Sequence, residues 1–235
     1  MKAMILAAGR GERMRPLTDT IPKPLLQVGG RTLIEWHLQN LARAGVESVV
    51  INLSWLGSKI SSELGDGSRW GVQIEYSDEG DVALETGGGI FKALPYLGSQ
   101  PFWLVNGDVF SDFDFARAPK LDESALAQLV LVPNPLHHPQ GDVHLIGASG
   151  IRGVGHVEFS DGGDARRWTY SGIGVYRPEF FKQCPGGRFP LLPWLERAAA
   201  ARQLQGFVHP GLWCDVGTPE RLQALDERLA AGAVG

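Results

Sequence analysis

The sequence predicts a three-layer α/β/α fold with a mixed, mainly parallel central sheet and a small antiparallel layer. In the first half of the chain, short apolar segments alternate with amphipathic helical segments, which is the pattern of βαβ units. From about Ala127 onward, apolar segments follow one another, which favours antiparallel pairing. The 235 residues, of which 43% are apolar, suffice for a sizeable core.

Four apolar segments of the first half are predicted strands, at residues 3–8, 48–53, 72–76 and 102–106. A helix is predicted from the capping residue Thr32 to about Ala44, because Gly45 then ends it. A shorter helix is predicted near residues 56–64. Right-handed connections make these strands parallel, so their carboxyl ends meet at one edge, where such sheets bind ligands.

The second half of the chain supplies the antiparallel strands, predicted at residues 127–132, 143–146, 156–159 and 168–176. A helix over 191–202, a strand over 204–208 and a last helix to about Ala231 follow. Thr218 and Pro219 form a strong start for that last helix. We expect one catalytic domain over residues 1–229 and a short tail over 230–235.

Composition excludes several classes of protein. The net charge is −4 with both signs scattered, which argues against a nucleic-acid-binding chain. The two cysteines, Cys184 and Cys214, are too few for a disulfide-rich scaffold or a Cys-rich zinc site. No signal peptide and no apolar run of transmembrane length is visible. We therefore expect a cytoplasmic monomer with no membrane or nucleic-acid partner.

The segment from Ile5 to Leu26 carries the strongest chemical signal. Gly9 and Gly11 follow the first strand, and glycines let backbone N–H groups turn toward an anion. Arg13 and Arg15 come next, and then Lys23, which Pro22 and Pro24 hold toward an extended conformation. These donors suit a polyphosphate. The segment is neither a Walker P-loop nor a full G-x-G-x-x-G, since Met14 replaces the third glycine.

The order A-A-G-x-G-x-R, R-P-L-T and P-K-P-L resembles the signature of the sugar-1-phosphate nucleotidylyltransferases. The resemblance spans residues 1 to about 225 and implies the Rossmann-like nucleotidyltransferase fold. It implies that the triphosphate is held by Ala8, Gly9, Gly11, Glu12 and Arg13. It also implies that Arg13 and Lys23 are catalytic, with Lys23 neutralising the phosphates during transfer.

A base pocket is predicted where the third strand leads into Leu84-Glu85-Thr86-Gly87-Gly88-Gly89. This run is similar to the family's L-G-T-A-G-A and departs from it at Glu85. A carboxylate accepts from a ring N–H of uracil or guanine, so we assign Glu79 as the base reader and place Thr86 and Gly87 beside the nucleotide. The alternative is a polar loop and a glycine-rich helix start without a ligand.

Two aspartates are candidate metal ligands. Asp108 follows a buried strand in Asn106-Gly107-Asp108, and magnesium takes one or two protein carboxylates besides substrate phosphates. By resemblance Asp108 is a catalytic metal ligand and Asn106 lies near the sugar. The W-x-D-x-G-T-P run resembles the family's second metal motif, with Asp215 as the ligand. The resemblance therefore implies Mg²⁺ as the cofactor.

Sugar contacts are assigned to Gly141, Asp142 and Ser171, the last in a run that resembles the family's sugar-side strand. The chain departs from the family in having no lysine between Asp142 and Ser171 to grip the sugar phosphate. Arg152, Arg166 and Arg167 are candidate substitutes. His137 and His138 stand in a proline-broken run that fits no zinc motif, and we assign them to a solvated loop.

The resemblance implies nucleotidyl transfer from UTP to a sugar-1-phosphate, with pyrophosphate as the second product. A compact uridylyltransferase without a further C-terminal domain fits best. Guanylyl or cytidylyl transfer, and glucose or mannose phosphates as acceptors, stay open. A non-catalytic, nucleotide-sensing protein is the alternative of another class, although the intact Arg13, Lys23, Asp108 and Asp215 argue against it.

Overall fold

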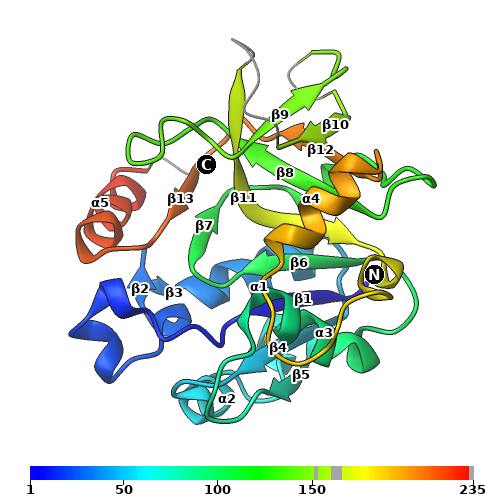
Figure 1. Ribbon diagram of the computed structural model, residues 1–235. Helices are drawn as coiled ribbons and strands as arrows, with labels where there is room; N and C mark the ends of the chain where they lie inside the picture. Colours follow the sequence, from blue (N-terminus) through cyan, green and yellow to red (C-terminus); the bar gives the residue numbers. More distant parts are fainter. Residues whose placement is uncertain (151–152, 160–165, 233–235) are drawn as a thin grey trace.

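The computed structural model describes residues 1–150, 153–159 and 166–232, which fold around a central sheet (Figure 1). Its strands are β1 (Ala3–Leu6), β4 (Ser48–Leu53), β5 (Gln73–Asp78), β6 (Phe102–Asn106), β8 (Ala127–Val132), β9 (Val143–Ile146), β10 (Gly155–Glu158), β11 (Arg167–Tyr176) and β12 (Leu204–Val208). Within the described residues they run in the order β5-β4-β1-β6-β11-β8-β12-β10-β9.

The sheet is mixed. β1 pairs in parallel with β4 and β6, and β4 pairs in parallel with β5, as the first half of the sequence predicts. β11 runs antiparallel between β6 and β8, and β9 and β10 form the antiparallel edge. The predicted α/β fold is confirmed, with the antiparallel strands continuing the central sheet.

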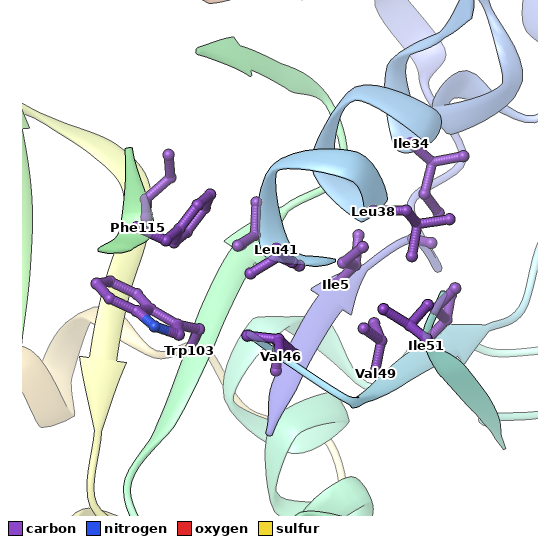
Figure 2. Packing of buried hydrophobic residues seen from close by; sticks show 14 of the residues in the cluster. Ile5, Ile34, Leu38, Leu41, Val46, Val49, Ile51, Trp103 and Phe115 are labelled. Carbon is purple, nitrogen blue, oxygen red and sulfur yellow. The ribbon is translucent and has the colours of Figure 1, made fainter. Parts of the chain in front are cut away.

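Helices cover both faces of the sheet. α1 (Leu33–Arg43) and α2 (Gly57–Leu64) pack on one face, and α3 (Glu85–Leu97) and α4 (Leu192–Ala200) pack on the other. Successive residues of a strand point to opposite faces, so Ile5 of β1 joins the α1 side (Figure 2), whereas Met4 joins the α3 side. The same alternation in β4 sends Val49 and Ile51 toward α1.

The start of α1 lies where the sequence predicts it. The Thr32 hydroxyl accepts from the Glu35 backbone N–H at 3.4 Å, and a Glu35 carboxylate oxygen accepts from the Thr32 N–H at 2.8 Å. This reciprocal capping box satisfies two backbone donors that no helical carbonyl can reach.

A smaller apolar cluster joins the two ends of the chain. β7 (Val109–Ser111) pairs antiparallel with β13 (Trp213–Asp215), and β2 (Gln27–Val28) pairs with β3 (Arg31–Thr32). α5 (Pro219–Ala230) begins at the capping residue Thr218 and buries Leu225 in this cluster, which also holds Met14 and Phe110. The C-terminal helix is therefore packed behind the loop that follows β1.

The prediction of a single catalytic domain over residues 1–229 stays a prediction. Of the predicted tail, residues 233–235 lie outside the described residues. In the part of the chain that the structure describes, no helix is long and apolar enough to cross a membrane.

A buried histidine links α1 to β7. The His37 Nε2 lies 2.8 Å from the Val109 carbonyl oxygen, so this nitrogen carries the proton that is donated. Burial lowers the pKa of His37 from 6.5 to about 4, although the Val109 carbonyl and the Asp108 carboxylate act in the opposite direction. His37 is therefore neutral at pH 7, and its ring fixes the strand that follows Asp108.

Because the pKa of His37 is lowered in the folded protein, we expect the stability of the fold to decrease at acidic pH. The unfolded chain binds a proton at His37 below pH 6.5, whereas the folded chain binds it only near pH 4. The contribution of neutral His37 to the free energy of unfolding is therefore complete above the unfolded pKa. It is lost as the pH falls, so the folded state loses about 2 kcal/mol between pH 7 and pH 5. Urea unfolding of the wild type and His37→Gln at both pH values measures it. Between pH 7 and pH 5, the free energy of unfolding should fall by about 2 kcal/mol less in His37→Gln than in the wild type. An equal fall in both proteins would contradict the assignment.

Candidate active site

The loop after β1 is shaped for close approach by an anion. Gly11 has a φ of +69°, and a Cβ there would lie 2.9 Å from the Thr18 methyl carbon. The Thr18 hydroxyl donates to the Gly11 carbonyl at 2.8 Å, and Met14 anchors the loop in the core. Gly9 has open space where a Cβ would stand. Backbone N–H groups between Ala8 and Gly11 can therefore meet a phosphate without obstruction.

The three arginines of this loop have different surroundings. Arg10 donates to the Thr18 carbonyl and to Asp19, both at 2.9 Å, and its guanidinium lies 3.6 Å from the centre of the Trp55 ring. Arg15 pairs with Asp19 at 2.9 Å on the surface. Arg13 is exposed and lines the cleft beside the loop. The expectation that Arg15 also faces the phosphates is not supported, because Asp19 holds its guanidinium outside the cleft lining.

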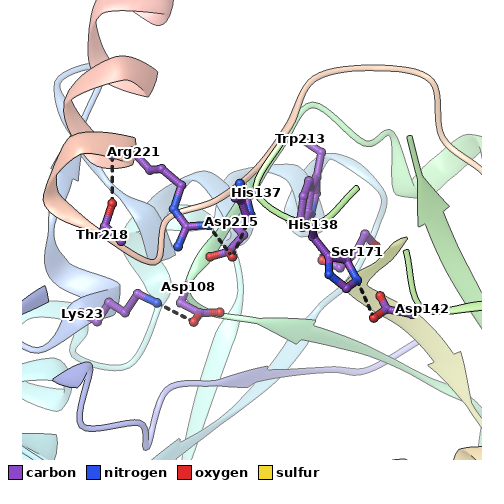
Figure 3. Close-up of polar contacts among 10 residues, drawn as sticks. All are labelled: Lys23, Asp108, His137, His138, Asp142, Ser171, Trp213, Asp215, Thr218 and Arg221. Carbon is purple, nitrogen blue, oxygen red and sulfur yellow. Dashed lines mark hydrogen bonds and ion pairs between the residues drawn. The ribbon is translucent and has the colours of Figure 1, made fainter. Parts of the chain in front are cut away.

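Lys23 reaches the cleft from a short helical turn. The prolines were expected to hold it extended, whereas Lys23 begins a 3-10 helix that ends at Leu25, with Pro22 as the extended capping residue. The lysine is 7% exposed, and its Nζ lies 2.6 Å from an Asp108 carboxylate oxygen (Figure 3). The buried ammonium is thus aimed at the residue that follows β6, the strand next to β1 and its phosphate loop.

Asp108 and Asp215 are brought together by backbone pairing. The Gly107 N–H donates to the Leu6 carbonyl at 2.9 Å, and a Cβ on Gly107 would lie 2.6 Å from that oxygen. The Val216 N–H donates to the Asp108 carbonyl at 3.0 Å, and Asp215 pairs with Val109 across β7 and β13. The two predicted metal ligands therefore lie on adjacent chain segments.

The Asp215 carboxylate already has two basic neighbours. Arg221 Nη1 lies 2.9 Å from Asp215 Oδ2, and His137 Nε2 lies 3.4 Å from the same oxygen (Figure 3). Asp108 has its side chain 42% exposed toward the cleft. In the described residues no group of three His, Cys, Asp or Glu side chains could hold a metal ion. Two carboxylates still fit magnesium, which takes its other ligands from phosphates and water.

Two clefts meet at Asp108. The first, of about 380 Å³, lies between the phosphate loop and the start of α3, and the second measures about 410 Å³. Arg13, Asn106 and Asp108 line both clefts. Each cleft is large enough for part of a small ligand, so two ligands can meet at Asp108.

The first cleft collects most of the predicted nucleotide-binding residues, namely Ala8, Gly9, Gly11, Glu12, Arg13, Lys23, Glu79 and Thr86. Gly87 lies one residue farther into α3 and is buried, where a Cβ would collide with the Phe189 ring. Glu79 Oε1 accepts from Asn52 Nδ2 and Oε2 accepts from the Leu84 N–H, both at 2.6 Å. The assignment of Glu79 as base reader stays a prediction.

The start of α3 has an unusual backbone. Glu85 has a φ of +62°, which side-chain-bearing residues rarely adopt, at the position where the family's pattern has glycine. The Gly88 N–H donates to the Phe189 carbonyl at 3.1 Å, and Arg188 pairs with Glu85 at 3.1 Å. A Cβ on Gly88 would collide with the Gly187 carbonyl. The glycine run thus allows the 186–189 segment to form a wall beside this helix.

The second cleft contains part of the predicted sugar site. Asn106 lines it and packs against Gly172, whose φ is +78°. Ser171 also lines it, but its hydroxyl donates to the Val130 carbonyl at 2.7 Å and accepts from the Ile173 N–H at 3.1 Å. These bonds lie at the irregularity in β11, where its register with β8 shifts. The Ser171 hydroxyl is therefore engaged by backbone groups, and the Ser171 carbonyl accepts from Trp213 Nε1 at 2.9 Å.

Gly141 and Asp142 are not among the described residues that line this cleft. Asp142 accepts from the Tyr170 N–H at 2.8 Å and lies 2.9 Å from His138 Nε2 (Figure 3). Gly141 has a φ of +64° and packs against Asn134. Asp142 thus positions His138 and the strand beside the cleft.

Two histidines that the sequence analysis did not assign to the site lie at its second cleft. His137 and His138 both line that cleft. They belong to the loop between β8 and β9, as predicted, and each side chain is 41% exposed. One feature of the sequence could have indicated their place. Their loop follows β8 and precedes the turn at Gly141, a residue that was itself assigned to the sugar site.

The arginines proposed for the sugar phosphate are engaged elsewhere. The Arg166 guanidinium lies 3.9 Å from the centre of the Trp168 ring, and Arg167 donates to the Asp142 carbonyl at 2.8 Å. Neither lines the second cleft, and Arg152 lies outside the described residues. Arg13 and the two histidines are the basic side chains that the described lining offers in their place.

Comparison with known proteins identifies the class. A family model described as nucleotidyl transferase matches residues 2–141. A solved structure of a Bacillus anthracis protein in complex with sucrose shares the fold, with a TM-score of 0.80 and 21% identity over 97% of this chain and 94% of that one. The chain therefore belongs to the nucleotidyl transferase family and is an enzyme of that family.

Two relatives match along almost their whole length. An N-acetylmuramate alpha-1-phosphate uridylyltransferase of Neisseria meningitidis is 50% identical over 99% of both chains. The protein of the same name in Caulobacter vibrioides is 36% identical, over 97% of this chain and 96% of its own.

Replacing Lys23 by alanine should lower turnover by about two to three orders of magnitude, the range for losing one preorganised charge-stabilising donor. The fold should survive. Turnover is measured at saturating substrate concentrations, and the melting temperature is measured to check that the fold is intact. The exposed Lys92 gives the matched control Lys92→Ala. Near-normal turnover of Lys23→Ala would exclude the lysine from the reaction.

Asp108→Asn and Asp215→Asn should each abolish metal-dependent turnover, because an amide binds Mg²⁺ much more weakly than a carboxylate does. Nucleotide binding at the glycine loop should persist. A magnesium titration of turnover tests this, with Asp114→Asn, an exposed capping position, as the control. Full activity of either variant at low magnesium would remove that aspartate from the metal site.

Proposed function

We propose that the chain joins UTP and N-acetylmuramic acid α-1-phosphate, giving UDP-N-acetylmuramic acid and pyrophosphate. A phosphate oxygen of the sugar-1-phosphate attacks the α-phosphorus of UTP, and a new P–O bond forms. The bond from that phosphorus to the bridging oxygen breaks, and pyrophosphate leaves with the electron pair. The attacking phosphate is already an anion near neutral pH, so the step needs positioning and charge neutralisation rather than a general base.

The full-length similarity to two relatives of this name carries the proposal. The two clefts supply independent support, since a transfer between two substrates needs two sites that share the reacting centre. Arg13, Asn106 and Asp108 occupy that shared position. We assign UTP to the first cleft and the sugar phosphate to the second.

The charges near Asp108 suit the transferred group. Lys23 and Arg13 both line the first cleft, so a triphosphate there would meet both cations. Fixed charges aimed at a developing anion stabilise a transition state without reorganisation. Lys23 is held by Asp108 in the protein alone and would turn toward phosphate oxygens when the nucleotide binds.

We assign Mg²⁺ to Asp108 and Asp215. When bound there, the ion would neutralise the phosphate oxygens on which negative charge develops. Arg221 and His137 hold the Asp215 carboxylate in place. These contacts keep the Asp215 carboxylate at the second cleft, which Asp108 also lines.

On the acceptor side, we assign the sugar to the wall formed by Asn106, Tyr170, Ser171 and Trp213. His137 and His138 offer ring nitrogens for the sugar phosphate or for the lactyl carboxylate that distinguishes this sugar. We further propose that the enzyme acts as a cytoplasmic monomer in peptidoglycan recycling, where it would return a cell-wall sugar to a nucleotide-activated form.

The test is a matrix of the four ribonucleoside triphosphates against α-1-phosphates of N-acetylmuramic acid, N-acetylglucosamine, glucose and mannose, with magnesium. Product mass and pyrophosphate release identify the pair with the highest kcat/KM. The expected pair is UTP with the muramic acid phosphate. A higher kcat/KM with glucose or mannose phosphate would refute the acceptor, and a higher value with GTP would refute the base. No turnover with any pair would favour a nucleotide-sensing role.

A further inference from the structure

Asn52 and Glu79 form a buried bridge across the first cleft. Asn52 is the fifth residue of β4 and 3% exposed, and Glu79 follows β5 and is 8% exposed. The Asn52 Nδ2 donates to Glu79 Oε1 at 2.6 Å. Both residues line the first cleft, so this bridge belongs to the nucleotide side of the site.

Each end of the bridge holds a backbone segment that forms the cleft. Asn52 Oδ1 accepts from the Ala7 N–H at 2.7 Å, directly before the phosphate loop. Glu79 Oε2 accepts from the Leu84 N–H at 2.6 Å, directly before α3. The Leu84 carbonyl in turn accepts from the Phe189 N–H at 3.2 Å. The bridge therefore connects the phosphate loop to the wall over α3.

The surrounding sequence leaves room for this pair. A Cβ on Gly89 would collide with Glu79 Oε1 and would lie 2.9 Å from Asn52 Nδ2. Gly89 is a buried residue inside α3, where glycine costs helix stability relative to alanine. Keeping a glycine there fits a helix that must lie directly against the two polar side chains.

We infer that Asn52 and Glu79 are positioning residues, which set the distance between the phosphate loop and the base-side wall through four polar atoms in series. The inference rests on the proposed function only in taking the first cleft as the nucleotide site. It assigns Glu79 the role of holding Asn52 and the Leu84 N–H, whereas a base reader would use its carboxylate to accept from a ring N–H of the base itself.

Exchanging the amide of Asn52 and the carboxylate of Glu79 distinguishes a positioning residue from a base reader. With Glu79→Gln alone, the new NH₂ group faces either the Leu84 N–H or the Asn52 NH₂, so donor meets donor. Turning the Asn52 amide over only moves the conflict, because the Asn52 NH₂ then faces the Ala7 N–H. With Asn52→Asp alone, two carboxylates face each other. In the double variant Asn52→Asp/Glu79→Gln, the new carboxylate accepts from Ala7 and from the new amide. The amide oxygen still accepts from Leu84, so every bond of the bridge has a donor and an acceptor.

The experiment measures the dissociation constant of magnesium-bound nucleotide by calorimetry, and the KM of the sugar phosphate and kcat beside it. It uses whichever of the four triphosphates the wild type binds most tightly, so a wrong base or acceptor assignment does not decide the result. Each single variant should weaken nucleotide binding about ten- to a hundred-fold, as expected for a lost bond to a charged group. The double variant should return to within about threefold of the wild type.

The sugar-phosphate KM should change far less than nucleotide binding in the single variants. A role in folding alone would instead lower the melting temperature while the remaining folded protein bound nucleotide normally, and that result would overturn the inference. A double variant that binds as weakly as Glu79→Gln would also overturn it, in favour of a base reader that needs the Glu79 carboxylate. Glu75→Gln removes the same charge from β5 outside the bridge and should bind like the wild type.

Discussion

The ion pair between Lys23 and Asp108 is the contact on which the site depends. It joins a residue of the phosphate loop region to the end of β6, 85 positions later in the chain. A lysine that is almost fully buried needs a partner, since an unpaired buried ammonium is costly. The carboxylate supplies it and remains partly exposed to the cleft. In the proposed function, the pair therefore holds a cation beside the phosphates of the nucleotide.

Close backbone approach makes this geometry possible. Gly107 lets the turn after β6 lie against the end of β1, and the Val216 N–H reaches the Asp108 carbonyl from the C-terminal part of the chain. The pairing of β7 with β13 then brings Asp215 beside Asp108. His37 holds the same strand from beneath through the Val109 carbonyl. The proposed reacting centre is thus built on strand ends and short turns, whose backbone is fixed by hydrogen bonds.

Much of the fold follows from local sequence patterns. The predicted strands 48–53 and 102–106 agree with β4 and β6, because each is a continuous apolar run bounded by polar or turn residues. The resemblance assigned Asp108 and Asp215 as metal ligands, and the strand pairing of β7 with β13 brings the two residues close together. Their roles, like those of the other assigned residues, remain predictions.

The acceptor side was less predictable, because its side-chain directions are set by contacts between distant segments. Ser171 turns its hydroxyl inward at an irregularity that no local pattern reveals. Arg166 lies over Trp168, and Asp142 is used by Tyr170 and His138. His137 enters the cleft only because its loop returns to Asp215, 78 positions later. The contact between the His137 loop and Asp215 cannot be predicted from the order of the residues alone.

A structure of the protein with its product and magnesium tests the central claim most directly, namely that two substrates meet at Asp108. The account predicts the uracil and ribose in the cleft between the phosphate loop and α3, and the sugar in the cleft beside Trp213. It also predicts the diphosphate between Arg13, Lys23 and Asp108. A product molecule whose sugar occupied the first cleft, or whose diphosphate lay away from Asp108, would contradict it.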